Sequence, residues 1–228
     1  MHRSSILAAC AISTAAALLS ADSLPQVLAK LDESATSFES MSANVKKLSH
    51  TEVINDNMEE SGSILLKRQK PRGLAALIDF TKPDPRTIAF SGNKAEIYYP
   101  KLKKVDEYNL SKYTDIVDQF LLVGFGTAGK ELAANYDIKL GGAETVEGVA
   151  TNRLDLTPKT DARREKLKLL QLWIAGGGYP VQQKFLQPSG DFTVFTYTDV
   201  KVNPPLAEDA LRLKLPKGVI RERPQRSD

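Results

Sequence analysis

The sequence predicts one mainly β domain of the α+β class, in which an antiparallel sheet is accompanied by about three helices. Short segments rich in β-branched and aromatic residues alternate with turn signals from residue 42 to residue 215, which indicates about eleven strands. Only three segments carry apolar residues at helical spacing. Neighbouring strands joined by short turns run antiparallel, so the strands are expected to form one sheet with few helices to cover it.

The first 21 residues have the features of an export signal. Ile6 to Leu19 is an alanine-rich stretch without charge, and small residues at Ser20 and Ala21 precede a cleavage point. The stretch is shorter than the roughly 20 apolar residues that span a bilayer. We therefore predict a signal peptide over 1–21 and one mature domain over 22–228.

Cys10 is the only cysteine of the chain. The sequence Leu7-Ala8-Ala9-Cys10 resembles a lipoprotein acylation box, but the apolar run continues beyond it. We expect Cys10 to be removed with the signal, which leaves a mature chain without disulfides or cysteine metal sites. An acylated Cys10 that anchors the protein is the alternative.

The mature chain begins with an amphipathic helix, because apolar residues from Leu24 to Phe38 fall at helical spacing and Pro25 suits a first turn. Two further helical segments are expected at 113–121 and 131–136. Strands are expected at 42–54, 62–68, 74–80, 87–90, 95–99, 101–110, 137–140, 151–156, 167–174, 179–187, 192–202 and 211–215.

No residue pattern indicates an enzyme or a cofactor site. Gly124 to Gly129 has the letters G-x-G-x-x-G, but a dinucleotide site needs a preceding strand in a parallel βαβ unit, so we interpret the segment as a flexible connector. His50 is the only histidine after the signal, and no serine lies in a nucleophile elbow. The 31 basic and 28 acidic residues are interspersed, which gives no electrostatic reason to expect nucleic acid. We expect no cofactor, no metal and no enzymatic activity.

Four sequence blocks resemble the periplasmic outer-membrane lipoprotein carrier (LolA) family within the lipoprotein-localisation superfold. They are Gly62–Arg68, Ser91–Pro100, Phe120–Gly124 and Leu211–Val219, in the family's order and spacing over most of 22–220. The resemblance implies an open antiparallel half-barrel of about eleven strands, covered by a lid of about three helices.

The resemblance also implies a function. A soluble, monomeric periplasmic carrier of this kind binds lipoprotein acyl chains in a hydrophobic cavity and delivers them to the outer membrane. Its partners are lipoproteins, an inner-membrane lipoprotein-releasing transporter and an outer-membrane receptor. A lipid-binding sensor or regulatory protein with the same fold, and a carrier of another lipid, are the alternatives.

The expected cavity lining consists of apolar side chains on the strands and the lid. Alternation decides which of them share a face, although it does not decide which face is concave. The residues are Val45, Ile64, Leu66, Ile97, Tyr99, Leu170, Leu172 and Ile174 on strands, with Leu28, Leu31, Phe120 and Leu121 on helices.

Arg68 is the expected lid-control residue, because the family has an arginine of that role at the end of the matching block. The family usually has proline after this arginine, whereas here Gln69 follows and proline comes only at Pro71. Arg72 is therefore a second candidate for the same role.

Overall fold

The computed structural model describes residues 22–69, 73–110 and 123–224. The predicted signal at 1–21 and the predicted helix at 113–121 lie outside these ranges, as do Arg72, Phe120 and Leu121. No helix among the described residues is long and apolar enough to cross a membrane.

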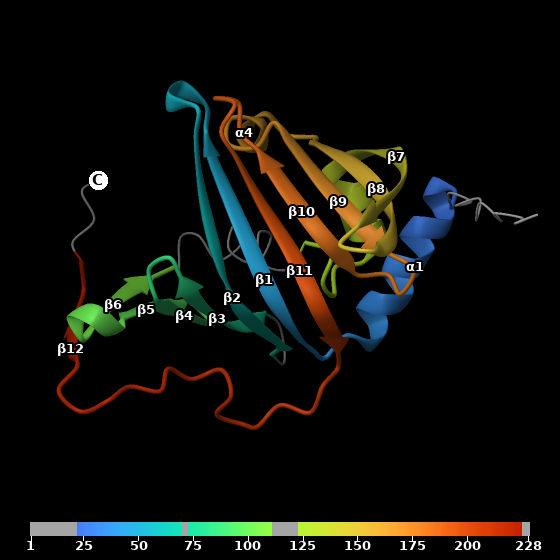
Figure 1. Cartoon of the computed structure of the whole chain (residues 1–228). Coiled ribbons are helices and arrows are strands. Elements are labelled where there is room, and N and C mark those ends of the chain that lie inside the picture. The colour runs from blue at the N-terminus through green and yellow to red at the C-terminus, as the bar shows by residue number, and fades with distance from the viewer. Residues whose placement is uncertain (1–21, 70–72, 111–122, 225–228) are drawn as a thin grey trace, which may run out of the picture.

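The described chain forms one twelve-stranded sheet (Figure 1). The strands run in the spatial order β12-β6-β5-β4-β3-β2-β1-β11-β10-β9-β8-β7, and all neighbours are antiparallel except β12 and β6. The first six strands are β1 (Ser40–Thr51), β2 (Asp56–Arg68), β3 (Leu74–Lys82), β4 (Arg86–Ser91), β5 (Lys94–Tyr99) and β6 (Lys104–Asn109). The others are β7 (Tyr136–Val146), β8 (Val149–Pro158), β9 (Leu169–Ala175), β10 (Pro180–Leu186), β11 (Phe192–Val202) and β12 (Ile220–Glu222).

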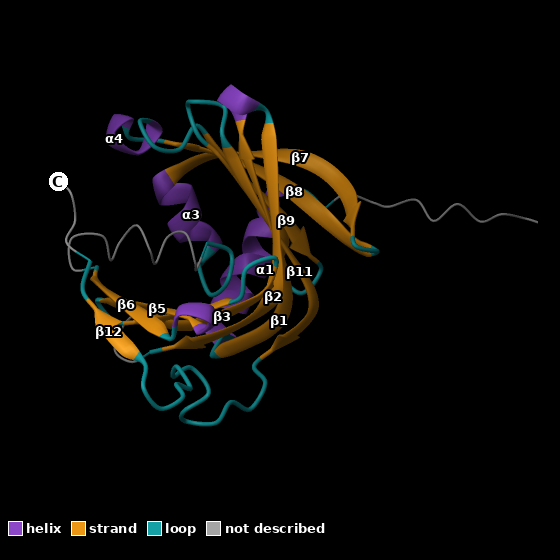
Figure 2. Cartoon of the chain, turned by 60° about the vertical axis from the view of Figure 1, so that its left-hand side comes forward, coloured by secondary structure: helices purple, strands orange, loops and turns teal. Residues whose placement is uncertain are grey.

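Three α-helices accompany the sheet in the described ranges: α1 (Leu24–Ser37), α3 (Gly129–Asn135) and the four-residue α4 (Asp161–Arg164). Two 3-10 turns, Glu52–Ile54 and Pro100–Leu102, close the β1–β2 and β5–β6 hairpins. Figure 2 shows the sheet curving around α1 and α3, so that both helices lie on its concave side. The predicted class, mainly β with an open antiparallel half-barrel and a few covering helices, is confirmed.

The C-terminal segment differs from the prediction. Residues 211–215 form no strand, although Leu211, Leu213 and Leu215 are partly buried while Arg212 and Lys214 are exposed. A strand needs a hydrogen-bonding partner as well as alternation, and the pairing begins only at Ile220, where β12 adds to the edge strand β6 in parallel. The short helix α4 was also not predicted, because four residues are too few for a periodic signal.

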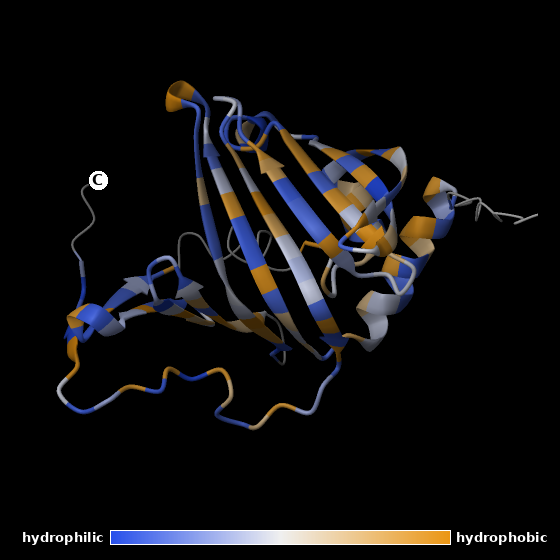
Figure 3. Ribbon diagram, in the orientation of Figure 1, coloured by the Kyte–Doolittle hydropathy of each residue, from blue (hydrophilic) through white to orange (hydrophobic). Residues whose placement is uncertain are grey.

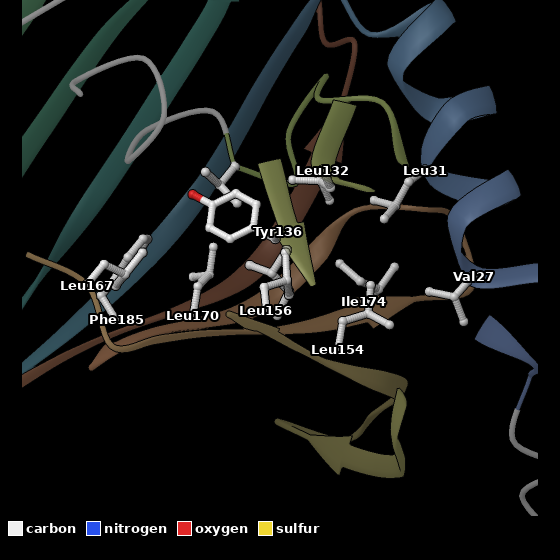
Figure 4. Packing of buried hydrophobic residues seen from close by; sticks show 12 residues of the cluster. Val27, Leu31, Leu132, Tyr136, Leu154, Leu156, Leu167, Leu170, Ile174 and Phe185 are labelled. Carbon is white, nitrogen blue, oxygen red and sulfur yellow. The ribbon is translucent and has the colours of Figure 1, made fainter. Parts of the chain in front are cut away.

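The core consists of two clusters on the concave side. The first joins α1 to β8, β9 and β10 and contains Val27, Leu31, Leu154, Leu156, Leu170, Leu172, Ile174 and Phe185, among others (Figure 4). The second joins β1, β2 and β3 to the segments that follow α1 and precede α3, and it contains Phe38, Met41, Val45, Ile64, Leu66, Ile78, Phe80, Phe125 and Tyr197, among others. Figure 3 shows apolar and polar residues alternating along β1 and β11, as one buried and one solvent-facing surface require.

Strand β12 is held to the sheet by charge as well as by its ladder. Arg221 Nη1 lies 2.5 Å from both Glu96 Oε1 and Glu107 Oε1. The hydrogen bond from Arg221, together with Lys94, lowers the pKa of Glu107 to about 2, against the smaller opposing effect of burial.

We expect Arg221→Gln to loosen β12. Amides of residues 220–222 should lose hydrogen-exchange protection at pH 7, measured by mass spectrometry and corrected for intrinsic rates. In the unchanged protein, protection should fall as the pH drops from about 4.5 toward 2, because a carboxyl with a lowered pKa stabilises the fold only while it is ionised. The exposed Arg212→Gln is the control, and equal protection in all three proteins would contradict this account.

Candidate functional site

All described residues of the predicted lining share one face of the sheet. Leu170, Leu172 and Ile174 pack with Leu31 of α1, and Leu28 packs against the same cluster. Val45, Ile64 and Leu66 lie in the second cluster. Ile97 pairs with Ile88, which packs on that cluster, and Tyr99 follows Ile97 at the alternation of two. The register that the sequence left open therefore places these residues on the concave side.

This face is filled unevenly. Leu66, Leu170 and Leu172 are fully buried. On β4 and β5, by contrast, the face carries Ile88, Phe90, Ile97 and Tyr99, which are only half-buried. Beside them lies a cavity of about 500 Å³, open to solvent and lined mainly by apolar atoms. Its lining residues are Ala95, Ile97, Glu107, Tyr108, Asn109, Leu110, Arg223 and Pro224.

The segment before α3 is inserted into the hollow between the two clusters. Val123 belongs to the first cluster and Phe125 to the second, and both are buried. Phe125 packs edge-on against Tyr197, with ring centroids 5.2 Å apart. This segment thus occupies apolar space that the sheet and helices leave open.

A buried polar pair holds the inserted segment. Gln183 donates from Nε2 to the carbonyl of Val123, and the Tyr197 hydroxyl donates to Gln183 Oε1 at 2.8 Å. Burial raises the pKa of the Tyr197 hydroxyl, which keeps it protonated as a donor. The sequence analysis missed this pair. The available signal was the polar Gln183 between Val181 and Phe185, at a position where alternation points a side chain into the core.

The glycines at 124, 126 and 129 have a steric role that the interpretation as a flexible connector did not foresee. Gly124 and Gly126 have φ angles of +89° and +71°, a region that favours glycine. A Cβ on Gly126 would lie 2.7 Å from Arg68 Nη2, and one on Gly129 would lie 2.5 Å from the Leu28 carbonyl oxygen. The glycines therefore let the segment turn sharply and approach Arg68 and α1 closely.

Arg68 joins the sheet to the elements that cover it. From the end of β2, its Nε donates to the Phe38 carbonyl at 3.0 Å, and its Nη2 donates to the Ala35 carbonyl at 3.0 Å and the Gly126 carbonyl at 3.1 Å. Ala35 lies in the last turn of α1, where carbonyls lack partners within the helix. One guanidinium thus ties β2 to the end of α1 and to the inserted segment.

The concave face also carries charge at one end. Glu60 is buried between Lys47, 2.9 Å away, and Arg86, whose guanidinium stacks 4.7 Å over Phe80. Burial raises the pKa of Glu60, but hydrogen bonds from Arg86 and Lys47 lower it more, so the carboxyl stays below its usual 4.5. On β6, Asp106 lies 3.0 Å from Lys104. These charges are paired, and they border the apolar part of the face. Within the described residues, no group of three or more His, Cys, Asp or Glu could hold a metal ion.

The fold and this face define an open half-barrel with a helix-covered apolar hollow. No protein-family model matches the chain. It is 30% identical over 139 residues to the outer-membrane lipoprotein carrier protein of Cupriavidus necator, and 29% identical over 139 residues to that of Cupriavidus taiwanensis. The match covers 61% of this chain and 61% of each relative. These findings support a LolA-like family for the chain, as its sequence blocks indicated. Both relatives are named carrier proteins, in agreement with the expectation that the chain is not an enzyme.

Solved structures of low sequence identity share the fold. An uncharacterised conserved protein from Thermus thermophilus superposes with a TM-score of 0.55 at 13% identity, covering 89% of this chain and all of the other. The crystal structure of MucB superposes with a TM-score of 0.54 at 16% identity, covering 84% of this chain and 62% of the other. MucB of Pseudomonas aeruginosa has also been solved in complex with MucA.

We expect Gly126→Ala to destabilise the protein by about 1–3 kcal/mol, because the methyl group meets Arg68 and Phe38 at a positive φ. Chemical denaturation measures the change in the free energy of unfolding. Gly92→Ala is the matched control: its φ is +55°, and a Cβ there would meet nothing within 4 Å. If both variants lose the same stability, the close approach to Arg68 contributes nothing.

Proposed function

We propose that the protein is a periplasmic carrier that binds lipoprotein acyl chains in the concave hollow and delivers them to the outer membrane. The observation that carries this proposal is the uneven filling of the hollow. Ile88, Phe90, Ile97 and Tyr99 are apolar, inward-facing and only half-buried, beside an open cavity. The names of the curated relatives support the same cargo. The export signal that the sequence predicts at 1–21 agrees with a periplasmic location.

The inserted segment makes reversible binding plausible in energetic terms. Burying an acyl chain contributes roughly 0.8 kcal/mol per methylene, or about 12 kcal/mol for fifteen methylenes. A carrier that gained all of this would bind the acyl chain as tightly as a membrane does, so that transfer to the outer membrane would release no free energy. If the acyl chain displaces Val123 and Phe125, however, these side chains lose their buried contacts while the acyl chain gains them. The net affinity is then much smaller, which suits transfer to an acceptor that binds more tightly.

In this proposal Arg68 controls the covering elements. Its three acceptors belong to α1, the residue after it and the inserted segment, so the contacts made by one side chain hold all of them against the sheet. Loading would break these bonds, and an inner-membrane lipoprotein-releasing transporter would supply the work. An outer-membrane receptor would accept the cargo. The protein would act as a soluble monomer. The apolar residues that the sequence predicts as the cavity lining would contact the acyl chains.

A lipid-binding sensor and a carrier of another lipid are the competing functions. The similarity to MucB, which forms a complex with MucA, concerns the fold and does not select between them. Both alternatives predict a different molecule in the hollow or at its surface. Identification of the bound molecule is therefore the measurement that distinguishes the three functions.

The mature protein, incubated with membranes that contain a triacylated lipoprotein and the releasing transporter, should form a soluble complex with that lipoprotein. Native mass spectrometry and size exclusion detect the complex. Ile97→Gln should lower the yield several-fold, because it places an amide among the half-buried apolar residues. The control is Ile54→Gln, at a side chain 68% exposed on the β1–β2 turn. Recovery of free lipid or a regulatory protein, with no lipoprotein, would overturn the proposal.

Arg68→Leu should open the hollow. The change removes three hydrogen bonds but keeps an apolar contact with Phe38, so binding of the neutral dye N-phenyl-1-naphthylamine should rise several-fold in fluorescence titrations. Lys67→Leu, one residue earlier and on the opposite face of β2, provides the control. Unchanged dye binding by Arg68→Leu would remove this residue from the control of access.

A further inference from the structure

A second, smaller cavity opens at one end of the concave face. Its volume is about 210 Å³, and its lining residues are Lys47, Lys166, Leu167, Phe185, Gln187, Thr193 and Phe195. They come from β1, β10, β11 and the segment between α4 and β9, which brings four separate parts of the chain together. Figure 4 shows Leu167 and Phe185 side by side at one end of the first cluster.

The apolar part of this cavity adjoins both core clusters. Phe185 and Phe195 pack edge-on with centroids 6.1 Å apart. Phe195 is only partly buried and packs against both core clusters, so it lies at the seam between them. Val123 and Phe125, one in each cluster, occupy the same seam further in. An alkyl chain that starts at this cavity would therefore extend along the seam by displacing Val123 and Phe125, the same displacement that the proposed function requires.

The polar part of the cavity carries positive charge and hydrogen-bond donors. Lys47, Lys166, Gln187 and Thr193 can all donate, and none of the lining residues is acidic. The nearby Glu60 is neutralised by contacts with both Lys47 and Arg86, which leaves this group with a net positive charge. Within the described residues, Lys166 is exposed and forms no ion pair. An anion at the cavity entrance would thus meet the Lys166 ammonium, together with the Lys47 ammonium that Glu60 already contacts, and the aromatic rings of Phe185 and Phe195 lie below them.

We propose that this cavity binds the anionic head of a single-chain amphiphile, a carboxylate or a phosphate, while its alkyl chain enters the seam. The inference rests on the proposed lipid-binding function and extends it, because the acyl chains of a lipoprotein present no such charge at this position. Lys166 and Lys47 contact the head, Thr193 and Gln187 donate to it, and Phe195 supports the first part of the chain. A carboxylate and a phosphate share this chemistry, and the experiment separates them.

The test compares dodecanoate, dodecyl phosphate and neutral dodecanol, which share one chain length, by isothermal titration calorimetry on the mature protein. Both anions should bind more tightly than dodecanol. Lys166→Gln should weaken the anions by about three- to tenfold and leave dodecanol unchanged. Lys166→Arg should restore most of the loss. The exposed Lys168→Gln, which removes the same charge two residues away, should change none of the affinities.

The outcomes separate this inference from the proposed function. Tighter binding of dodecyl phosphate identifies a phosphate head, and tighter binding of dodecanoate identifies a carboxylate; each supports the site. If dodecanol binds as tightly as the anions, or if Lys166→Gln and Lys168→Gln weaken the anions equally, the anionic site is refuted while the lipid-binding hollow stands. If no amphiphile binds, the anionic site is refuted, and the lipoprotein complex described above decides the proposed function separately.

Discussion

An apolar concave surface that the described helices cover only in part is the constraint on which the rest of the structure depends. Alternation along the strands directs Ile64, Leu66, Leu170, Leu172 and Ile174 to one side of the sheet. Helix α1 packs on one part of that side, and the inserted segment fills another. The part over β4 and β5 stays half-open, because the described helices do not reach it. The two clusters, the inserted segment and the open cavities all follow because the apolar face of the sheet is larger than the part that α1 and α3 cover.

The same mismatch explains why the covering elements are attached by polar contacts. The hydrophobic effect is not directional, so apolar packing alone would allow a loop to take many positions inside an apolar hollow. The hydrogen bonds from Arg68 and Gln183 select one position, because each needs a particular carbonyl at a particular distance. These bonds fix the inserted segment against the sheet at particular carbonyl groups.

The sequence predicted the sheet, its antiparallel order and the shared face of the lining residues, because a period of two is a local property that each strand displays by itself. It could not predict that Val123 and Phe125 enter the hollow, since that depends on the shape left by distant strands. Alternation from Leu211 to Leu215 predicted a strand wrongly, because the pairing partner, β6, is reached only at Ile220. Arg68 was assigned by resemblance, and only the structure shows the three carbonyls that it contacts.

Each edge of the sheet carries a feature that opposes pairing with another strand. An open sheet of twelve strands has two edges, and unpaired edges invite pairing with other chains. The parallel strand β12 covers β6, and the Arg221 contacts with Glu96 and Glu107 hold it there. At the other edge, β7 carries an irregularity between Leu140 and Gly142, which breaks the regular ladder that a partner strand would need. Both edges thus present few regular, unpaired backbone groups to another chain, although the concave face between them stays apolar.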